Sequence, residues 1–347
     1  MSYFLTAIII TALLTWFTRR VALKFGIVDA PDNLRKRHQT VTPLLGGLGI
    51  WAGFWMVAGY LVFFTQYLGP NLRVSQLLSL FLATTILLVM GIWDDARSLS
   101  ARWRLLITAA AVLLIMVGGV RIDKVTNPFG GIFYLDFWQI KIGALATIVV
   151  VADILVFFWI LGMIYAAKIL DGLDGLTTGA GAIGALMIFL VANGERWYQP
   201  DVALLALVFC GACLGFLLFN FHPAKIFLGE SGSLIIGAML GALSVISGGK
   251  FATALLVMAV PILDLGWVIA KRIARGQPIF TGDREHLHFR LLDAGVGHRR
   301  AVLLYYLFFI LFGLATVFFQ SIGKVAVLLA LFTIIIVIEF LSYRFKK

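Results

Sequence analysis

The sequence is poor in charged residues and in cysteine. Only 13% of its 347 residues are charged, whereas 61% are hydrophobic, and the mean hydropathy is +1.01. A soluble fold of this length does not need so much apolar surface, so the composition predicts a polytopic membrane protein. The two cysteines, Cys210 and Cys213, lie in an apolar run beside Gly211 and Ala212. This setting predicts close packing of small residues and argues against disulfides or a cysteine metal site.

Other features that the sequence lacks narrow the class of protein further. The first apolar segment, residues 3–17, lacks a positively charged leading stretch and a small-residue cleavage site, which predicts a retained helix instead of a signal peptide. We find no internal repeat and no low-complexity segment, so a single domain over residues 1–347 is the simplest expectation. The net charge of +11 could suit a nucleic acid. Its basic residues cluster in alternate loops, however, so membrane topology explains the charge and we expect no nucleic-acid partner.

The chain does have apolar runs of the length that crosses a bilayer, about 17–25 residues each. They predict an all-α polytopic integral membrane protein with about eleven transmembrane helices. The runs are residues 2–18, 44–66, 74–92, 104–120, 140–163, 176–194, 200–219, 233–248, 251–271, 301–320 and 323–343.

The distribution of lysine and arginine predicts the orientation of these helices. One set of alternating loops holds 21 of them and the other set holds 7. Because cytoplasmic loops carry the excess of basic residues, the N-terminus is predicted outside and the C-terminus in the cytoplasm. The cytoplasmic loops that would carry the chemistry are about 19–43, 93–103, 164–175, 220–232 and 272–300.

Five acidic residues lie at ends of apolar runs on this predicted cytoplasmic side. They are Asp94 and Asp95 in GIWDDARS, Asp171 and Asp174 in KILDGLDGL, and Glu230 in FLGESGS. Carboxylates gathered at a membrane face are costly unless a cation or a proton uses them. Since hard divalent cations prefer oxygen ligands, the leading hypothesis is a divalent-metal site at the inner leaflet.

Each of these motifs also has a purely structural interpretation. Asp94 could be a solvated helix end, and Asp174 could cap the next helix. The glycine-serine turn around Glu230 could be an ordinary N-cap, or its free amides could receive an anion such as pyrophosphate. Lys168, one turn before Asp171, would either pair with that aspartate or face a phosphate.

Further polar residues follow in two other segments. Asn220 in FNFHPAK could hydrogen-bond a sugar or base, or could merely end its helix. His286 and His288 in GDREHLHFRLL have no third histidine or cysteine nearby, so a zinc site is poorly supported. Together with Arg284 and Arg290 they would form a phosphate-binding patch, and solvated loop residues are an equally good interpretation.

Two remaining features have strong structural alternatives. Arg37 and His38 belong to the basic arm RKRH, which could bind substrate, anchor the topology or contact anionic lipid headgroups. Asp264 lies inside an apolar run, where an ionisable residue is a functional candidate by default. A structural hydrogen bond to a neighbouring helix would explain it equally well.

Taken in order, these segments resemble one known family. The segments RKRHQTVTPLLGG, GIWDDARS, KILDGLDGL, NFHPAKIFLGESGS, PILDLGWVIAKR and GDREHLHFRLLDAG resemble the polyprenyl-phosphate N-acetylhexosamine-1-phosphate transferases over about residues 26–300. The resemblance is greatest to the branch that uses UDP-N-acetylglucosamine, because of the D-R-x-H-x-H histidine loop and an eleventh helix that ends inside. The muramoyl-pentapeptide branch typically has a denser histidine cluster and ten helices.

The resemblance implies a reaction and a set of roles. A polyprenyl phosphate would attack the β-phosphorus of a UDP-sugar and release UMP, with Mg²⁺ or Mn²⁺ as cofactor, at the cytoplasmic face of the plasma membrane. Asp94 and Asp95 would activate the lipid phosphate or hold the metal, and Glu230 takes the position of the family's metal-binding aspartate. Asp171 and Asp174 would lie in the nucleotide pocket. Contacts to the nucleotide sugar or its diphosphate would come from Asn220, His286 and His288.

The sequence departs from the family pattern at several positions. The family commonly has aspartate where Glu230 stands, asparagine where Tyr165 and Lys168 stand, and a further histidine where Phe289 stands. Rival interpretations are a transporter, a CDP-alcohol phosphotransferase, a muramoyl-pentapeptide-type transferase and a non-catalytic homologue. A transporter would show repeats and mid-membrane charges, and the CDP-alcohol enzymes pack their aspartates into one stretch. Oligomeric state stays open, with a homodimer as one option.

Overall fold

A computed structural model describes residues 1–29, 41–65, 69, 71–122, 124–127, 130–142, 146–195, 198–248, 251–278, 286–319 and 321–344. These residues are mostly helical. The helices are α1 (Ser2–Phe25), α2 (Gly46–Phe64), α3 (Val74–Arg97), α4 (Ala101–Val117), α5 (Val150–Leu170), α6 (Leu176–Ala192), α7 (Pro200–Asn220), α8 (Gly229–Ile246), α9 (Phe251–Val257), α10 (Ala259–Ala274), α11 (Leu287–Asp293), α12 (His298–Phe318) and α13 (Ser321–Arg344).

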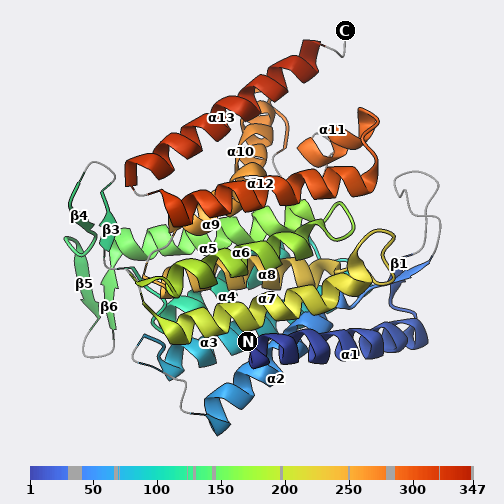
Figure 1. Cartoon of the computed structure of the whole chain (residues 1–347), viewed down its shortest axis with the longest axis horizontal. Coiled ribbons are helices and arrows are strands. Elements are labelled where there is room, and N and C mark those ends of the chain that lie inside the picture. Colours follow the sequence, from blue (N-terminus) through green and yellow to red (C-terminus); the bar gives the residue numbers. More distant parts are fainter. Residues whose placement is uncertain are drawn as a thin grey trace.

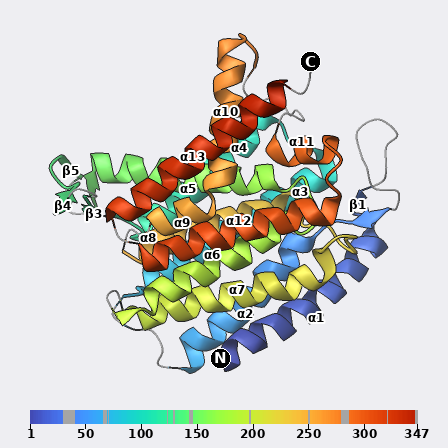
Figure 2. The same ribbon diagram turned by 45° about the horizontal axis from the view of Figure 1, so that its top comes forward.

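The described residues also form three small antiparallel sheets, and each has two strands. The strands are β1 (Val28–Asp29), β2 (Thr42–Pro43), β3 (Lys124–Thr126), β4 (Ile132–Tyr134), β5 (Gln139–Ile142) and β6 (Ala146–Val149). In each pair, one strand meets the strand that follows it in the chain. The pairs β3–β4 and β5–β6 lie at one end of the helical bundle, and β1 and α11 lie at the opposite end (Figures 1 and 2).

Seven helices within the described ranges are long and apolar enough to cross a membrane: α1, α2, α3, α5, α7, α8 and α12. This result confirms a multi-pass helical membrane protein, while the total of eleven spans stays a prediction. Helix α6 has 17 residues and α10 has 16, so each spans a shorter distance than a typical transmembrane helix.

Two of the predicted runs have the wrong boundaries. The run 140–163 begins in the β5–β6 hairpin, and α5 starts only at Val150. The first part of that run is rich in β-branched residues, which suit strands as well as membrane helices. The run 251–271 is divided between α9 and α10. The ring of Pro261 would clash with the carbonyl of Val257 in a continuous helix, which accounts for the break there.

Helix α8 forms the centre of the bundle. Every residue of α8 except Glu230 is buried, and the helix packs against α2, α3 and α5. A Cβ atom at Gly91 of α3 would lie 2.3 Å from the backbone of Ser231, and one at Gly237 would lie 2.4 Å from the Cα of Ile164 on α5. These close approaches hold the end of α3 against the start of α8, and the last part of α5 against the middle of α8, as small residues do in membrane helix packing.

The two cysteines also lie where small residues allow helices to pack closely. Cys210 and Cys213 are free and buried on α7, so the prediction of small-residue packing is confirmed. A Cβ at the neighbouring Gly211 would lie 2.7 Å from the Phe4 carbonyl oxygen of α1. The α1–α7 contact therefore depends on the small residues of the CGAC segment.

Candidate active site

Asp94 and Asp95 lie in the last turn of α3, and their side chains have different partners. The Asp94 carboxylate accepts hydrogen bonds from the backbone N of Leu99 (2.5 Å) and from Nη1 of Arg104 on α4 (3.0 Å). Its side chain is only 9% exposed. Asp94 therefore ties the end of α3 to α4 and is not the solvated helix end that the structural interpretation predicts, and its neighbour is left to face α8.

Asp95 faces the first turn of α8. Its Oδ1 accepts a hydrogen bond from the backbone N of Glu230 at 3.1 Å. Its Oδ2 is buried and accepts no hydrogen bond from any residue that the structure describes. A buried carboxylate oxygen without a donor is expensive, and a divalent cation would satisfy it.

Gly229 permits the close approach of Asp95 to the start of α8 in two ways. Its φ angle is 74°, which lies in the left-handed region that favours glycine. A Cβ atom there would lie 2.6 Å from Asp95 Oδ2. The glycine before Glu230 therefore serves both the turn into α8 and the space beside the unpaired carboxylate oxygen.

Glu230 forms an ion pair with Lys168 in the last turn of α5. The sequence predicts Asp171 or a phosphate as the partner of Lys168, and the structure places Glu230 there instead. Glu230 also benefits from the partial positive charge at the start of α8. Two positions at which this chain departs from the family pattern thus contact each other.

Asp171 follows α5 directly and is exposed. Desolvation of its carboxyl by the surrounding protein raises the pKa of that group well above the usual value. Repulsion from Glu230, Asp95 and Asp174 raises this pKa further, while Lys168 opposes the increase. We refer to Asp94, Asp95, Asp171 and Glu230 as the carboxylate cluster. The structure brings its members together from α3, the α5–α6 connection and α8.

His288 lies against the glycine that follows Asp171. A Cβ atom at Gly172 would lie 2.5 Å from His288 Nε2. The imidazole is 1% exposed, and neither of its ring nitrogens has a hydrogen-bond partner among the described residues. Burial, and secondarily the nearby His286, lowers its pKa to about 3. His288 is therefore neutral at physiological pH, and it contacts the loop that carries Asp171.

Asp264 on α10 holds the start of α11 in place. Its Oδ1 accepts a hydrogen bond from the backbone N of Leu287 at 3.1 Å, and its Oδ2 lies 2.9 Å from His286 Nδ1. Asp264 is 3% exposed, so these contacts satisfy a buried carboxylate. Of the two interpretations of Asp264, the structure supports the structural hydrogen bond, made here to the segment that presents His288.

Asn220, the last residue of α7, is committed to contacts within the protein. Its Oδ1 accepts hydrogen bonds from the backbone N of Gly175 (3.1 Å) and from Oγ1 of Thr178 (2.9 Å). Its Nδ2 donates to the carbonyl oxygen of Ile226 at 3.1 Å. Asn220 thereby joins the start of α6 to the α7–α8 connection, and its contact with a nucleotide sugar stays a prediction.

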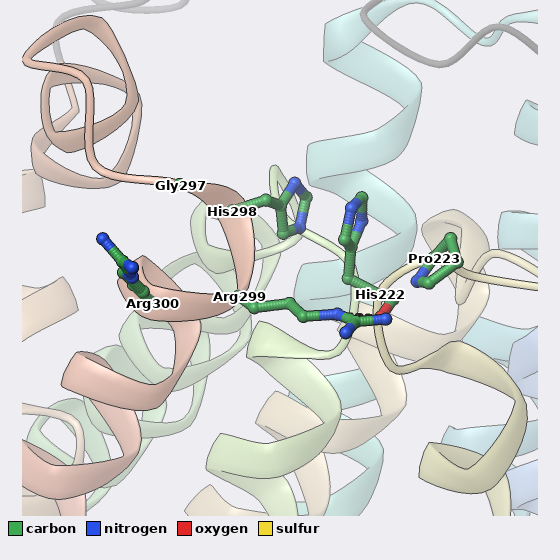
Figure 3. Close-up of a pocket in the computed structure, with 6 residues that line it drawn as sticks. All are labelled: His222, Pro223, Gly297, His298, Arg299 and Arg300. Carbon is green, nitrogen blue, oxygen red and sulfur yellow. Dashed lines mark hydrogen bonds between the residues drawn. The ribbon is translucent and has the colours of Figure 1, made fainter.

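Asp174 has partners that sequence reasoning missed. Its Oδ2 lies 2.6 Å from His222 Nδ1 and accepts a hydrogen bond from the backbone N of Ala224 at 3.2 Å. The ring of His222 stacks on that of His298 with centroids 3.9 Å apart. Both histidines line an open pocket of about 330 Å³ at the start of α12 (Figure 3). In the sequence, this contact was signalled only by the position of His222 in the segment FNFHPAK.

Three of the predicted site residues lie outside the described residues: Arg37, His38 and Arg284. The others occupy one end of the bundle, since Asp95 contacts Glu230, Lys168 contacts Glu230, and His288 lies against Gly172. The unpaired Oδ2 of Asp95 beside Glu230 has the donor chemistry that suits Mg²⁺ or Mn²⁺.

The fold and this cluster define a multi-pass membrane protein with carboxylates assembled at one end. The profile of the family described as glycosyl transferase family 4 matches residues 77–248. That stretch contains the carboxylate cluster, Lys168, Asp174 and Asn220, while His286 and His288 lie beyond it.

Three similar proteins extend the match to nearly the whole chain. The probable undecaprenyl-phosphate N-acetylglucosaminyl 1-phosphate transferase of Bacillus subtilis (strain 168) is 33% identical over 98% of this chain and 89% of its own length. The decaprenyl-phosphate N-acetylglucosaminephosphotransferase of Mycolicibacterium smegmatis is 35% identical over 96% of this chain and 86% of its own length. The undecaprenyl-phosphate alpha-N-acetylglucosaminyl 1-phosphate transferase of Escherichia coli (strain K12) is 29% identical over 91% and 81%, respectively.

The chain therefore belongs to glycosyl transferase family 4, among the polyprenyl-phosphate N-acetylglucosamine-1-phosphate transferases. The resemblance drawn from the sequence motifs is confirmed.

Proposed function

We propose that this protein transfers N-acetylglucosamine-1-phosphate from UDP-N-acetylglucosamine to a polyprenyl phosphate, giving a polyprenyl-diphosphate sugar and UMP. The printed names of the relatives support the sugar phosphate and the lipid acceptor. The observation that carries the proposal is the buried, unpaired Oδ2 of Asp95 beside Glu230. These two residues are separated by 135 positions in the sequence, and a cation held between their carboxylates would offset the cost of gathering such charges at a membrane face.

A divalent cation fits the carboxylate cluster, and Asp95 and Glu230 are its proposed ligands. Mg²⁺ or Mn²⁺ bound there would neutralise charge on the diphosphate, which matters because the attacking and leaving groups are both anionic. Lys168 pairs with Glu230 and adds a positive charge next to the same position. Asp94 anchors this end of α3 through Arg104 and so orients its neighbour Asp95.

Asp171 is the best placed of the carboxylates to hold a proton. It is exposed and its pKa is raised, so it holds an accepted proton more firmly than an ordinary aspartate does. An oxygen of the lipid phosphate forms the new bond to the β-phosphorus, and the bond from that phosphorus to the bridging oxygen breaks. UMP leaves with the bridging oxygen, while Asp171 takes the proton carried by the attacking phosphate.

The site is proposed to face the cytoplasm from the plasma membrane. The threefold excess of lysine and arginine in one set of loops supports this orientation, with eleven spans, an outer N-terminus and an inner C-terminus. A soluble UDP-sugar is available on that side, and the product would begin a cell-envelope polysaccharide.

A UMP-release assay tests the proposal. Purified protein would receive polyprenyl phosphate, a panel of UDP-sugars, and either Mg²⁺ or EDTA. We expect UMP release with UDP-N-acetylglucosamine and Mg²⁺, and none with EDTA. Turnover only with a UDP-muramoyl-pentapeptide would favour the other branch of the family. Absence of UMP release with every donor would refute the enzymatic proposal.

A further inference from the structure

Three metal-binding side chains outside the carboxylate cluster converge from separate segments. They are Asp174 in the α5–α6 connection, His222 in the α7–α8 connection, and His298, the first residue of α12. One ligand atom from each lies within 4.8 Å of the other two. Figure 3 shows the rings of His222 and His298 face to face, with an angle of 14° between their planes. We call these three residues the Asp-His-His triad.

We propose that the Asp-His-His triad binds a transition-metal ion of the Zn²⁺ class, at a site separate from the carboxylate cluster. Two imidazole nitrogens and one carboxylate oxygen form a donor set that Zn²⁺ commonly uses. With three protein ligands, the fourth position would open toward the pocket of about 330 Å³ that both histidines line. The ligand atoms lie within 4.8 Å of one another, so the side chains would move closer together around an ion held at about 2.0–2.2 Å from each ligand atom.

The residues around the triad already orient its members. Asp174 Oδ2 accepts a hydrogen bond from the Ala224 backbone N at 3.2 Å. Nε of Arg299 donates to the carbonyl oxygen of His222 at 3.0 Å, which joins α12 to the α7–α8 connection. Such outer hydrogen bonds fix ligand geometry in metal sites and strongly affect metal affinity.

Charge near the triad selects the kind of ion. Arg299 and Arg300 line the same pocket, and their positive charges oppose a hard cation that is held mainly by electrostatic attraction. Mg²⁺ is therefore expected at the carboxylate cluster, which offers oxygen ligands. An ion with intrinsic affinity for imidazole would tolerate the arginines better.

Metal at the triad would also affect catalysis, a consequence that rests on the proposed function. Asp174 shares its connection with Asp171 and lies in the predicted nucleotide pocket. An ion bound to Asp174 would hold that carboxylate against His222, which it already contacts, and would keep it from the nucleotide. We therefore expect added Zn²⁺ to inhibit UMP release in the wild type and to inhibit it less in a His298→Ala variant.

Direct metal binding tests the inference without any substrate. The full-length protein in detergent would be stripped with a chelator, returned to excess Mg²⁺ to fill the carboxylate cluster, and titrated with Co²⁺ and then Zn²⁺. We expect one Co²⁺ per chain, with the visible absorption of tetrahedral cobalt, displaced by one equivalent of Zn²⁺.

Variants identify the ligands. His222→Ala and His298→Ala should each weaken Co²⁺ binding on the order of 100-fold, since even a residue that only orients a ligand typically costs 10–100-fold. His286→Ala removes a histidine outside the triad and is the matched control, expected to bind Co²⁺ as the wild type does. If His298→Ala does not elute like the wild type in gel filtration, His298→Gln preserves more of the side-chain volume.

Four results would overturn the inference. The first three are the absence of a tetrahedral cobalt signal, unchanged binding in both triad variants, and equal loss in the His286→Ala control. The fourth is binding of inorganic phosphate to the pocket with no uptake of cobalt, because the arginines would then define an anion site. None of these readouts requires UMP release, so failure here and failure of the proposed enzyme activity are distinguishable.

Discussion

The carboxylate cluster and the Asp-His-His triad share one connection but differ in their donors. Asp171 of the cluster and Asp174 of the triad both lie between α5 and α6. The cluster otherwise draws on the end of α3 and the start of α8, and it offers oxygen atoms beside a lysine. The triad adds two imidazoles and lies beside two arginines. This difference shows how one short connection can contribute to two sites that prefer different cations.

The strongest test of the comparison is Asp95→Asn. It removes the charge of the one carboxylate in the cluster with a buried, unpaired oxygen, while the Asp-His-His triad stays intact. We expect UMP release to fall on the order of 10²–10³-fold or more, as for the loss of a preorganised electrostatic group. Asp153→Asn is the matched control, because Asp153 lies at the other end of the bundle and pairs with Arg121. Equal activity of Asp95→Asn and wild type would show that the Asp95 carboxylate has no role in the reaction.

Asp264→Ala should have an intermediate effect. It removes the acceptor for the Leu287 backbone N and the partner of His286, so α11 and His288 would shift relative to Gly172. We expect kcat/KM to fall on the order of tenfold, since small displacements of positioning groups are costly. Asp264→Asn keeps one acceptor oxygen and should restore part of the loss. Steady-state kinetics with varied UDP-sugar would check this order, and identical losses in the two variants would contradict it.

The pH dependence of the Mg²⁺ requirement tests whether the cation binds at the carboxylate cluster and not at the Asp-His-His triad. The pKa of Asp171 is raised by its surroundings and by Glu230, Asp95 and Asp174, so this carboxyl retains a proton at pH values where an ordinary aspartate has lost it. A cation near these carboxylates must compete with that proton, so its apparent affinity should fall as the pH falls through the raised pKa. Measured UMP release should therefore need more Mg²⁺ toward the acidic end of the pH range in which the protein is active than toward its alkaline end. A Mg²⁺ requirement that does not change with pH would argue that Asp171 lies outside the metal's influence.

The smallest change is expected for Glu230→Asp. It preserves a carboxylate at the start of α8 and restores the residue that the family commonly has there. We expect metal-dependent UMP release within about threefold of wild type, because the helix terminus still favours an anion. Glu230→Gln keeps the length but removes the charge, and it should lose most of the activity. If Glu230→Asp were as inactive as Glu230→Gln, the longer side chain would itself be required.

The sequence supports prediction of the carboxylate cluster because helix ends alternate between the two membrane faces. That alternation, together with the basic loops, puts Asp95 and Glu230 on one side, and the structure brings them into contact. This alternation does not give the rotation of each helix about its own axis. The sequence therefore did not reveal that Lys168 pairs with Glu230 and not with Asp171. Contact between His222 and His298 depends on how α12 packs against the α7–α8 connection, which no local pattern encodes.

The same physical limits apply to the fold. Hydropathy identifies apolar segments, and in the part of the chain that the structure describes seven helices are long and apolar enough to span a membrane. It does not distinguish the start of a span from an apolar hairpin, so β5 and β6 were predicted as part of a helix. A proline does signal the break between α9 and α10, but only when the carbonyl four residues before it is considered.

Manganese binding followed by electron paramagnetic resonance tests most directly whether Asp95 and Glu230 hold one ion. Titration of the purified full-length protein with Mn²⁺ should reveal one tight site that Mg²⁺ displaces. Asp95→Asn and Glu230→Gln should each abolish that site, whereas Asp153→Asn should retain it. Tight Mn²⁺ binding that survives in both Asp95→Asn and Glu230→Gln would contradict a shared site.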